Sequence, residues 1–260
     1  MIQLPECKRR DISLNKRKRV LIYGGSFSGK TTFADQFPDP IMLNTDGNTA
    51  NITAQCIHIK DEVKLNGRMS ERVYAWNIFK EYLTLLEAKQ NNFKTVVVDL
   101  VEGMYEYCRS YIFAKEGIEH ESDQGFGKGY ALVEKEFVDV MKRVCNLDYE
   151  NIILISRETN NTNVTKKTGE SISVIKPDLR DKISNTLTGM VDLVGRVVVD
   201  NDTNRKLSFK NDEYVFGGGR LNIKAKEIPL NYDAFTKLFT AAPATEVKEE
   251  VKQEVKTSRI

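Results

Sequence analysis

Gly24-Gly25-Ser26-Phe27-Ser28-Gly29-Lys30-Thr31 fits the pattern G-x-x-x-x-G-K-[ST] at every fixed position. The glycines let the chain curl so that successive backbone N–H groups point toward bound phosphate. Lys30 can reach the β- and γ-phosphates of a nucleoside triphosphate, and the Thr31 hydroxyl can ligate Mg²⁺. A chance Gly/Ser turn is the alternative. We predict an ATP site formed by Gly24, Gly25, Ser26, Phe27, Ser28, Gly29, Lys30, Thr31 and Thr32.

The sequence on either side of this loop has the character that the motif requires. Arg19-Val20-Leu21-Ile22-Tyr23 is a short apolar run typical of a buried strand, and residues 32–37 can begin a helix. A strand, a glycine-rich turn and a helix follow one another in phosphate-binding loops. The flanking segments therefore support the reading of the loop.

Composition places the chain among globular proteins. Its 260 residues can bury one sizeable core, and a net charge of +2 does not demand a nucleic-acid partner. No window approaches the roughly 18–20 consecutive apolar residues of a membrane span, and the charged N-terminus lacks the apolar segment of a signal peptide. The four cysteines are far apart, which favours reduced thiols over a metal site. We expect a cytoplasmic protein with no membrane partner.

Short apolar runs alternate with amphipathic segments through the first 200 residues. Strands are predicted at 19–23, 41–45, 94–99, 151–156 and 191–199. Helices are predicted near 30–37, 72–91, 103–116 and 129–146. This alternation predicts an α/β fold with a mainly parallel central sheet flanked by helices.

The pattern changes after residue 195. Short strands are predicted at 195–200, 206–210 and 214–216, followed by a last helix at 231–240. We therefore expect a core over residues 1–240 that ends in a short antiparallel extension. Residues 241–260 alternate Lys and Glu with few apolar groups, which predicts a disordered charged tail. A tail that docks on a partner is the alternative.

Carboxylates that could serve a bound nucleotide follow two of the predicted strands. Thr95-Val96-Val97-Val98-Asp99 is an apolar strand that ends in an acid, so Asp99 is predicted to hold Mg²⁺ together with Thr31. A plain helix cap is the alternative role for Asp99. Asp46 follows the second strand, whose end should lie beside the loop, and is the predicted base that orients water. Glu102 competes with Asp46 for this role, and Lys30 completes the predicted catalytic set.

The order of these elements resembles the RecA family of P-loop NTPases over residues 17–240. In the strand-exchange recombinases of that family, the second strand ends in an Asp-Thr-Glu-Gly-like stretch whose Glu is the catalytic carboxylate. This chain has Asn44-Thr45-Asp46-Gly47, with the shorter Asp in place of Glu. The resemblance implies that Asp46 is the hydrolytic carboxylate, with slower hydrolysis or a shifted water.

The fourth predicted strand ends in Ser156-Arg157-Glu158-Thr159. RecA-like proteins usually carry Asn or Gln at this place, where a polar side chain can sense the γ-phosphate. The stretch is more similar to phage-encoded RecA-like ATPases related to the Sak-type single-strand annealing proteins, in which a His-Glu pair often occurs. Arg157 is therefore predicted to bind the nucleotide. An ion pair at the strand end is the alternative.

The same resemblance implies that single-stranded DNA is a partner. An equivalent of the recombinase loop after the fourth strand would place Lys166 and Lys167 against phosphate, although a β-hairpin with a solvated tip is also compatible with the residues. Lys128 follows Gly127 and Phe126, and this segment suits base stacking beside a phosphate contact or forms a plain turn. Lys224 and Lys226 resemble late-core basic residues that reach a neighbouring subunit's γ-phosphate in filaments.

The leading interpretation is a phage-encoded, RecA-like ATPase that uses ATP and Mg²⁺ and acts on single-stranded DNA in recombination or annealing. It would work in the bacterial host cytoplasm, as a homo-oligomer or filament, with a single-strand binding protein or a helicase as further partners. A helicase-loader or packaging ATPase is one alternative. A small-molecule or nucleoside kinase is another, but Arg68 and Arg72 precede the third strand instead of following it as lid arginines do.

Overall fold

The computed structural model describes residues 4, 6, 7, 17–118, 128–165, 171–200, 203–221, 223 and 225–240. Its helices are α1 (Lys30–Asp35), α2 (Ala75–Ala88), α3 (Val101–Glu116), α4 (Lys128–Asn146), α5 (Asp181–Met190) and α6 (Tyr232–Thr240). Its strands are β1 (Lys18–Gly24), β2 (Pro40–Asn44), β3 (Gln55–His58), β4 (Glu62–Asn66), β5 (Met69–Val73), β6 (Thr95–Asp99), β7 (Asn151–Thr165), β8 (Ser171–Pro177), β9 (Leu193–Val199), β10 (Arg205–Ser208), β11 (Gly218–Gly219) and β12 (Glu227–Pro229).

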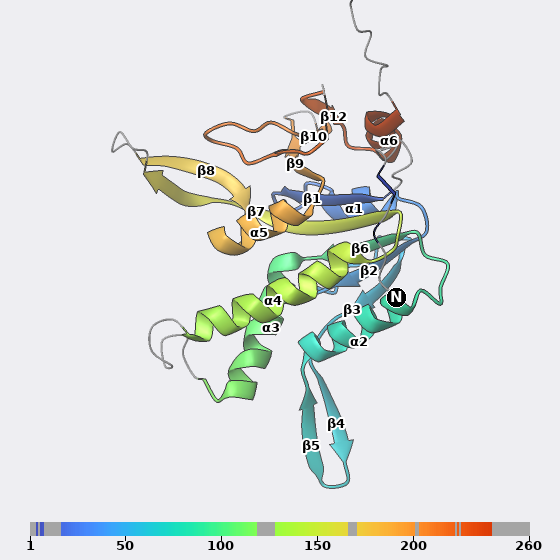
Figure 1. The fold of residues 1–260 in the computed structure, drawn as a ribbon, viewed down its shortest axis with the longest axis vertical. Coiled ribbons are helices and arrows are strands. Elements are labelled where there is room, and N and C mark those ends of the chain that lie inside the picture. Colours follow the sequence, from blue (N-terminus) through green and yellow to red (C-terminus); the bar gives the residue numbers. More distant parts are fainter. Residues whose placement is uncertain are drawn as a thin grey trace, which may run out of the picture.

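The main sheet has the strand order β12-β10-β9-β1-β7-β6-β2-β3. The strands from β9 to β3 run parallel, whereas β10 pairs antiparallel with β9 and with β12. The predicted parallel sheet with a short antiparallel extension is therefore confirmed. Because β7 lies between β1 and β6, the carboxyl ends of these three strands reach one edge of the sheet side by side (Figure 1).

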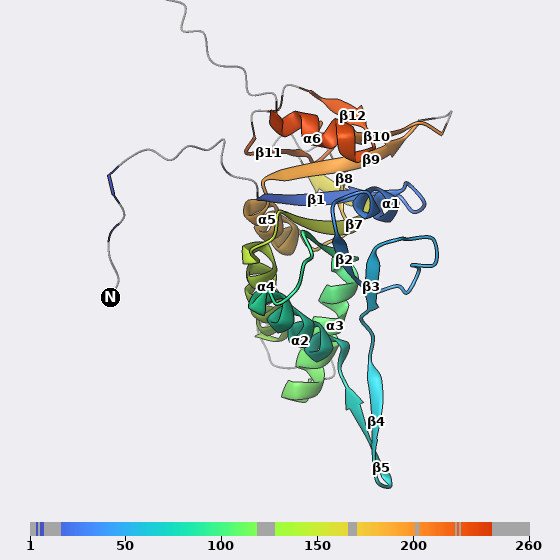
Figure 2. The ribbon, with the colours of Figure 1, turned by 90° about the vertical axis from the view of Figure 1, so that its right-hand side faces the viewer.

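The parallel strands are continuous apolar runs because both faces of the sheet are covered. Alternate residues of β1 point into two separate cores. Leu21 and Tyr23 pack on the side of α2, α3, α4 and α5, and Val20 and Ile22 pack on the side of α1 and α6. Figure 2 shows α6 above β1 and the helices α2, α3, α4 and α5 below it. Trp76, the largest fully buried side chain, stacks on Phe137 within the first core.

Two predictions about individual elements were wrong, and one helix was missed. The helix predicted from residue 72 begins at Ala75, because residues 69–73 form β5 and pair with β4. Asp61 accepts a hydrogen bond at 2.8 Å from the Ala75 N–H, which marks the start of α2. Residues 214–216 are not a strand, and Val215 makes only an isolated bridge to Ile175. The helix α5, which packs on α4, was not predicted.

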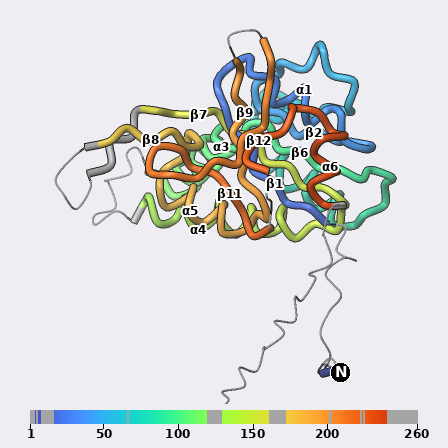
Figure 3. The backbone as a smooth tube through the Cα atoms, turned by 90° about the horizontal axis from the view of Figure 1, so that it is seen from above, coloured from blue at the N-terminus to red at the C-terminus, as the bar shows by residue number. Residues whose placement is uncertain are grey.

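Two hairpins extend from the body. β4 and β5 form a sheet of their own that projects beyond α2 (Figures 1 and 2). β7 continues past the main sheet and pairs antiparallel with β8, and Figure 3 shows this hairpin on one side of the body. The hairpin expected for this segment is therefore confirmed, and its contact with DNA stays a prediction. The predicted tail at 241–260 and the hairpin tip with Lys166 and Lys167 lie outside the described residues.

A glycine of α3 packs closely against the end of β2. A Cβ at Gly103 would lie 2.4 Å from the Thr45 Oγ1 atom, and this hydroxyl accepts a hydrogen bond at 3.1 Å from the Leu100 N–H. We expect Gly103→Ala to lower the free energy of unfolding by about 1–3 kcal/mol, because Thr45 must move within a packed region. Urea unfolding followed by circular dichroism measures this change.

Gly189→Ala is the matched control. Gly189 lies in α5, and a Cβ there would meet nothing within 4 Å. Alanine favours the helix over glycine, so this variant should gain up to about 1 kcal/mol. An unchanged stability of Gly103→Ala would contradict the close packing on Thr45.

Candidate functional site

The loop after β1 turns back over the sheet edge in a shape that two of its glycines permit. A Cβ at Gly24 would lie 2.8 Å from the Val197 carbonyl oxygen of β9. Gly29 has a φ of 94°, in the left-handed region that glycine adopts without strain. Phe27 also has a positive φ, of 62°, and its side chain is 91% exposed at the outer side of the loop. The glycine positions of the motif are therefore fixed by close approach and by backbone conformation.

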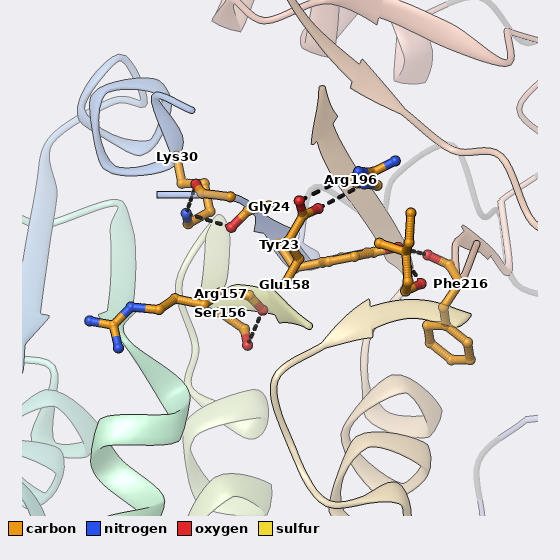
Figure 4. Close-up of polar contacts among 10 residues, drawn as sticks. Tyr23, Gly24, Lys30, Ser156, Arg157, Glu158, Arg196 and Phe216 are labelled. Carbon is orange, nitrogen blue, oxygen red and sulfur yellow. Dashed lines mark hydrogen bonds and ion pairs between the residues drawn. The ribbon is translucent and has the colours of Figure 1, made fainter. Parts of the chain in front are cut away.

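Lys30 is the charged group at the centre of the loop. Its ammonium donates hydrogen bonds of 2.8 Å to the carbonyl oxygens of Gly24 and Gly25, as Figure 4 shows. The residue is only 7% exposed. Burial lowers the pKa of Lys30, and the nearby carboxylate of Asp99 opposes this shift. The loop thus holds its cation at the edge of the sheet.

A hydroxyl and a carboxylate meet where α1 faces the end of β6. The Thr31 Oγ1 atom donates a hydrogen bond of 2.8 Å to Asp99 Oδ2, and the Asn44 side-chain amide lies 3.4 Å from the same oxygen. Asp99 is buried, and this burial raises the pKa of its carboxyl, against the hydrogen bond from Thr31. The structure therefore places the two predicted magnesium ligands in direct contact.

A pocket of about 450 Å³ opens between the loop and the ends of β2, β6 and β7. Nine residues predicted from the sequence line it: Ser26, Phe27, Gly29, Lys30, Thr31, Thr32, Asp46, Asp99 and Arg157. Gly24 and Gly25 contribute the carbonyls that hold Lys30, and Ser28 is buried behind the loop. Five lining residues were not predicted: Asn48, Asn51, Ile52, Leu100 and Arg205. They carry no motif, although three of them closely follow Asp46 in the chain.

The two competing carboxylates lie in different places. Asp46 is exposed on the wall of this pocket, and its Oδ1 atom accepts a hydrogen bond of 3.0 Å from the Asn48 N–H. Glu102 lines a neighbouring pocket of about 520 Å³ instead. Its Oε1 atom accepts a hydrogen bond of 2.9 Å from the Arg157 N–H, and burial raises its pKa. Asp46 therefore lines the pocket beside the phosphate-binding loop, whereas Glu102 lines the neighbouring one.

The side chains of Arg157 and Glu158 point in different directions, at the place where β7 leaves its pairing with β1. The exposed Arg157 side chain borders both pockets, and Figure 4 shows it pointing away from Glu158. Glu158 makes an ion pair of 2.8 Å with Arg196 of β9, beside the Gly25 backbone. The ion-pair alternative therefore holds for Glu158, with a partner that the sequence did not indicate. Arg157 makes no ion pair with any residue that the structure describes.

Other predicted residues lie away from the pocket or outside the described chain. Lys128 begins α4, and Lys226 is exposed near β12, where its carbonyl accepts a hydrogen bond of 2.8 Å from the Phe209 N–H. Lys166, Lys167 and Lys224 are not among the described residues. These lysines remain predictions from the sequence.

A lysine-bearing loop between a buried strand and a helix, with a strand-end aspartate beyond an intervening strand, defines a P-loop NTPase of α/β fold. Comparison with protein families agrees, since residues 16–221 match the model described as an AAA domain. The chain belongs to this family, whose members are generally ATPases. A comparison with curated proteins finds no match. Within the described residues, no helix is long and apolar enough to cross a membrane.

Proposed function

We propose that this protein hydrolyses ATP with Mg²⁺ and couples the nucleotide state to single-stranded DNA. The observation that carries the ATPase part is the meeting of Lys30 with the Thr31–Asp99 pair in one pocket at the sheet edge. A triphosphate needs a cation at its terminal phosphates and an oxygen-ligated metal beside it. Residues from two separate elements, α1 and β6, supply groups suited to both requirements.

The donor groups suit Mg²⁺. This ion prefers oxygen ligands and is usually bound by one or two protein groups together with substrate phosphates. The Thr31 hydroxyl and the Asp99 carboxylate, 2.8 Å apart, are such groups. Among the residues that the structure describes, no cluster of three or more His, Cys, Asp or Glu side chains could hold a metal alone. When bound, Mg²⁺ supplies charge neutralisation at the phosphates.

Three further side chains of the pocket have separate roles in hydrolysis. Lys30 neutralises charge that develops on the terminal phosphates, and Asp46, which lines the same pocket, orients the attacking water. Arg157, the last residue of β7 that pairs with β1, contacts the γ-phosphate. Its exposed side chain can move toward the nucleotide without breaking an ion pair to any described residue.

The course of β7 supports the DNA part of the proposal. The strand carries Arg157 at the pocket and continues without interruption into the hairpin with β8. A change at Arg157 therefore acts on the base of this hairpin. The affinity of the hairpin for DNA, with Lys166 and Lys167 as contacts, would then depend on which nucleotide is bound. The resemblance to phage annealing ATPases supports recombination or annealing as the process, in an oligomer or filament with a single-strand binding protein or helicase as partner.

We expect a fluorescent single-stranded oligonucleotide to bind more tightly with a slowly hydrolysed ATP analogue than with ADP. The affinity should fall steeply as salt rises, because phosphate contacts release counterions. Fluorescence anisotropy over a salt series measures this, with duplex DNA of the same length as control. Absence of nucleotide-dependent binding at low salt would contradict the DNA assignment. Stimulation of ATP hydrolysis by a replicative helicase instead would favour the helicase-loader alternative.

A further inference from the structure

Arg205 reaches the nucleotide pocket from the antiparallel side of the sheet. It is the first residue of β10, which pairs with β9 so that Arg205 lies opposite Val199. β9 runs parallel to β1, with Val197 opposite Gly24. Because β10 runs in the opposite direction, its beginning lies at the edge where the parallel strands end. The fold thus brings Arg205 just beyond the level of Gly24.

The side chain of Arg205 lies directly over the phosphate-binding loop. A Cβ at Gly29 would lie 3.1 Å from Arg205 Cδ and 3.2 Å from Nη1, so the arginine side chain packs closely on the backbone of this glycine. Arg205 also lines the 450 Å³ pocket together with Lys30 and Arg157. The exposed guanidinium therefore lies beside the loop whose backbone N–H groups are expected to bind phosphate.

Unlike the adjacent Lys206, this guanidinium has no acidic partner among the described residues. No hydrogen bond or ion pair joins it to another residue in the described ranges, whereas the adjacent Lys206 pairs with Asp200 at 3.0 Å. The lining residues carry three cations, Lys30, Arg157 and Arg205, against the two carboxylates Asp46 and Asp99. The excess positive charge matches an anionic ligand.

We propose that Arg205 binds the phosphate chain of the nucleotide within the same subunit, an inference that rests on the ATPase function proposed above. A guanidinium has a planar set of N–H donors that can bind phosphate oxygens in pairs. Arg205 approaches from β10 and Arg157 from β7, on opposite sides of β1. Two arginines thus clamp the phosphates over the loop, and β10 becomes part of the nucleotide site.

The test is equilibrium binding of a fluorescent ATP analogue with Mg²⁺ to the full chain. We expect Arg205→Ala to weaken binding about ten- to a hundredfold, the usual effect of losing a charged hydrogen-bonding partner. Arg205→Lys should recover part of the affinity because it keeps the charge. Lys206→Ala, a change in the neighbouring cation, should bind within about twofold of wild type. Unchanged affinity in Arg205→Ala overturns the inference.

Competition with inorganic tripolyphosphate tests whether the contact is to phosphate. This ligand has neither base nor ribose, so Arg205→Ala should weaken its competition by the same factor as it weakens the nucleotide. Full competition by tripolyphosphate in the variant overturns a phosphate contact. The wild-type measurement separates the two proposals. If the wild type binds no nucleotide, the ATPase proposal fails. If the wild type binds nucleotide and Arg205→Ala binds it equally well, only the assignment of Arg205 is wrong.

Discussion

Lys30→Ala is expected to abolish ATP hydrolysis and to weaken nucleotide binding about a hundredfold or more. The ammonium is buried in the loop, held by the Gly24 and Gly25 carbonyls, and it is the cation nearest the terminal phosphates in the proposed complex. Removing one preorganised donor from charge that develops in a transition state typically costs about a hundred- to a thousandfold in rate. Phosphate release measures the rate, and a fluorescent ATP analogue measures binding.

The control for this variant must show that charge at this position is the cause. Lys210→Ala removes an exposed lysine that pairs with Asp212 on the antiparallel edge, and it should leave rate and binding unchanged. Circular dichroism establishes whether the Lys30→Ala protein is folded, so that a loss of activity can be assigned to the missing ammonium. Hydrolysis at the wild-type rate in folded Lys30→Ala would remove the basis of the proposed function.

Asp46→Asn is expected to lower the hydrolysis rate about a hundredfold or more while ATP binding stays within a few-fold of wild type. The amide keeps the size of the side chain but cannot take a proton or hold water as a base does, and general bases contribute about a hundred- to ten-thousandfold. Single-turnover hydrolysis, measured beside equilibrium binding, separates the chemical step from affinity.

Glu102→Gln is the matched comparison, because it makes the same chemical change at the competing carboxylate. The glutamine oxygen can still accept the hydrogen bond from the Arg157 N–H, so most of the hydrolysis rate should remain. A large loss in Glu102→Gln with little loss in Asp46→Asn would reverse the assignment. Equal losses in the two variants would contradict the choice of Asp46 over Glu102 on the ground that Asp46 lines the nucleotide pocket.

The parallel core could be predicted from sequence because its strands are buried on both faces. Such strands appear as unbroken apolar runs, as in residues 95–99, and the amphipathic helices between them set the connections. The β4–β5 hairpin could not be found in this way. Its residues are exposed on both faces, and Val73 continues the helical spacing of Trp76 and Phe79, which moved the predicted helix start to residue 72.

Some residues of the site could also be predicted from local sequence, and others could not. The loop and Asp99 follow from local sequence, since a fixed pattern and a strand-end acid identify them. Arg205 and the Glu158–Arg196 pair depend on strands far apart in sequence, and their positions follow only from the sheet order. A basic residue at the start of an antiparallel edge strand is a weak signal, and it gains meaning only once that strand is placed beside β9.

The long strand β7 gives one segment of chain two different local stabilities. Ile152–Ile155 are hydrogen-bonded to β1 on one side and to β6 on the other, so their amides are freed only when the whole domain unfolds. From Glu158 onward the strand's partner is β8, and the ladder is irregular between Thr159 and Thr162. The outer half can therefore open by itself, and the boundary between the two regimes falls at Arg157. A single strand thus belongs to two cooperative units that meet at the nucleotide pocket.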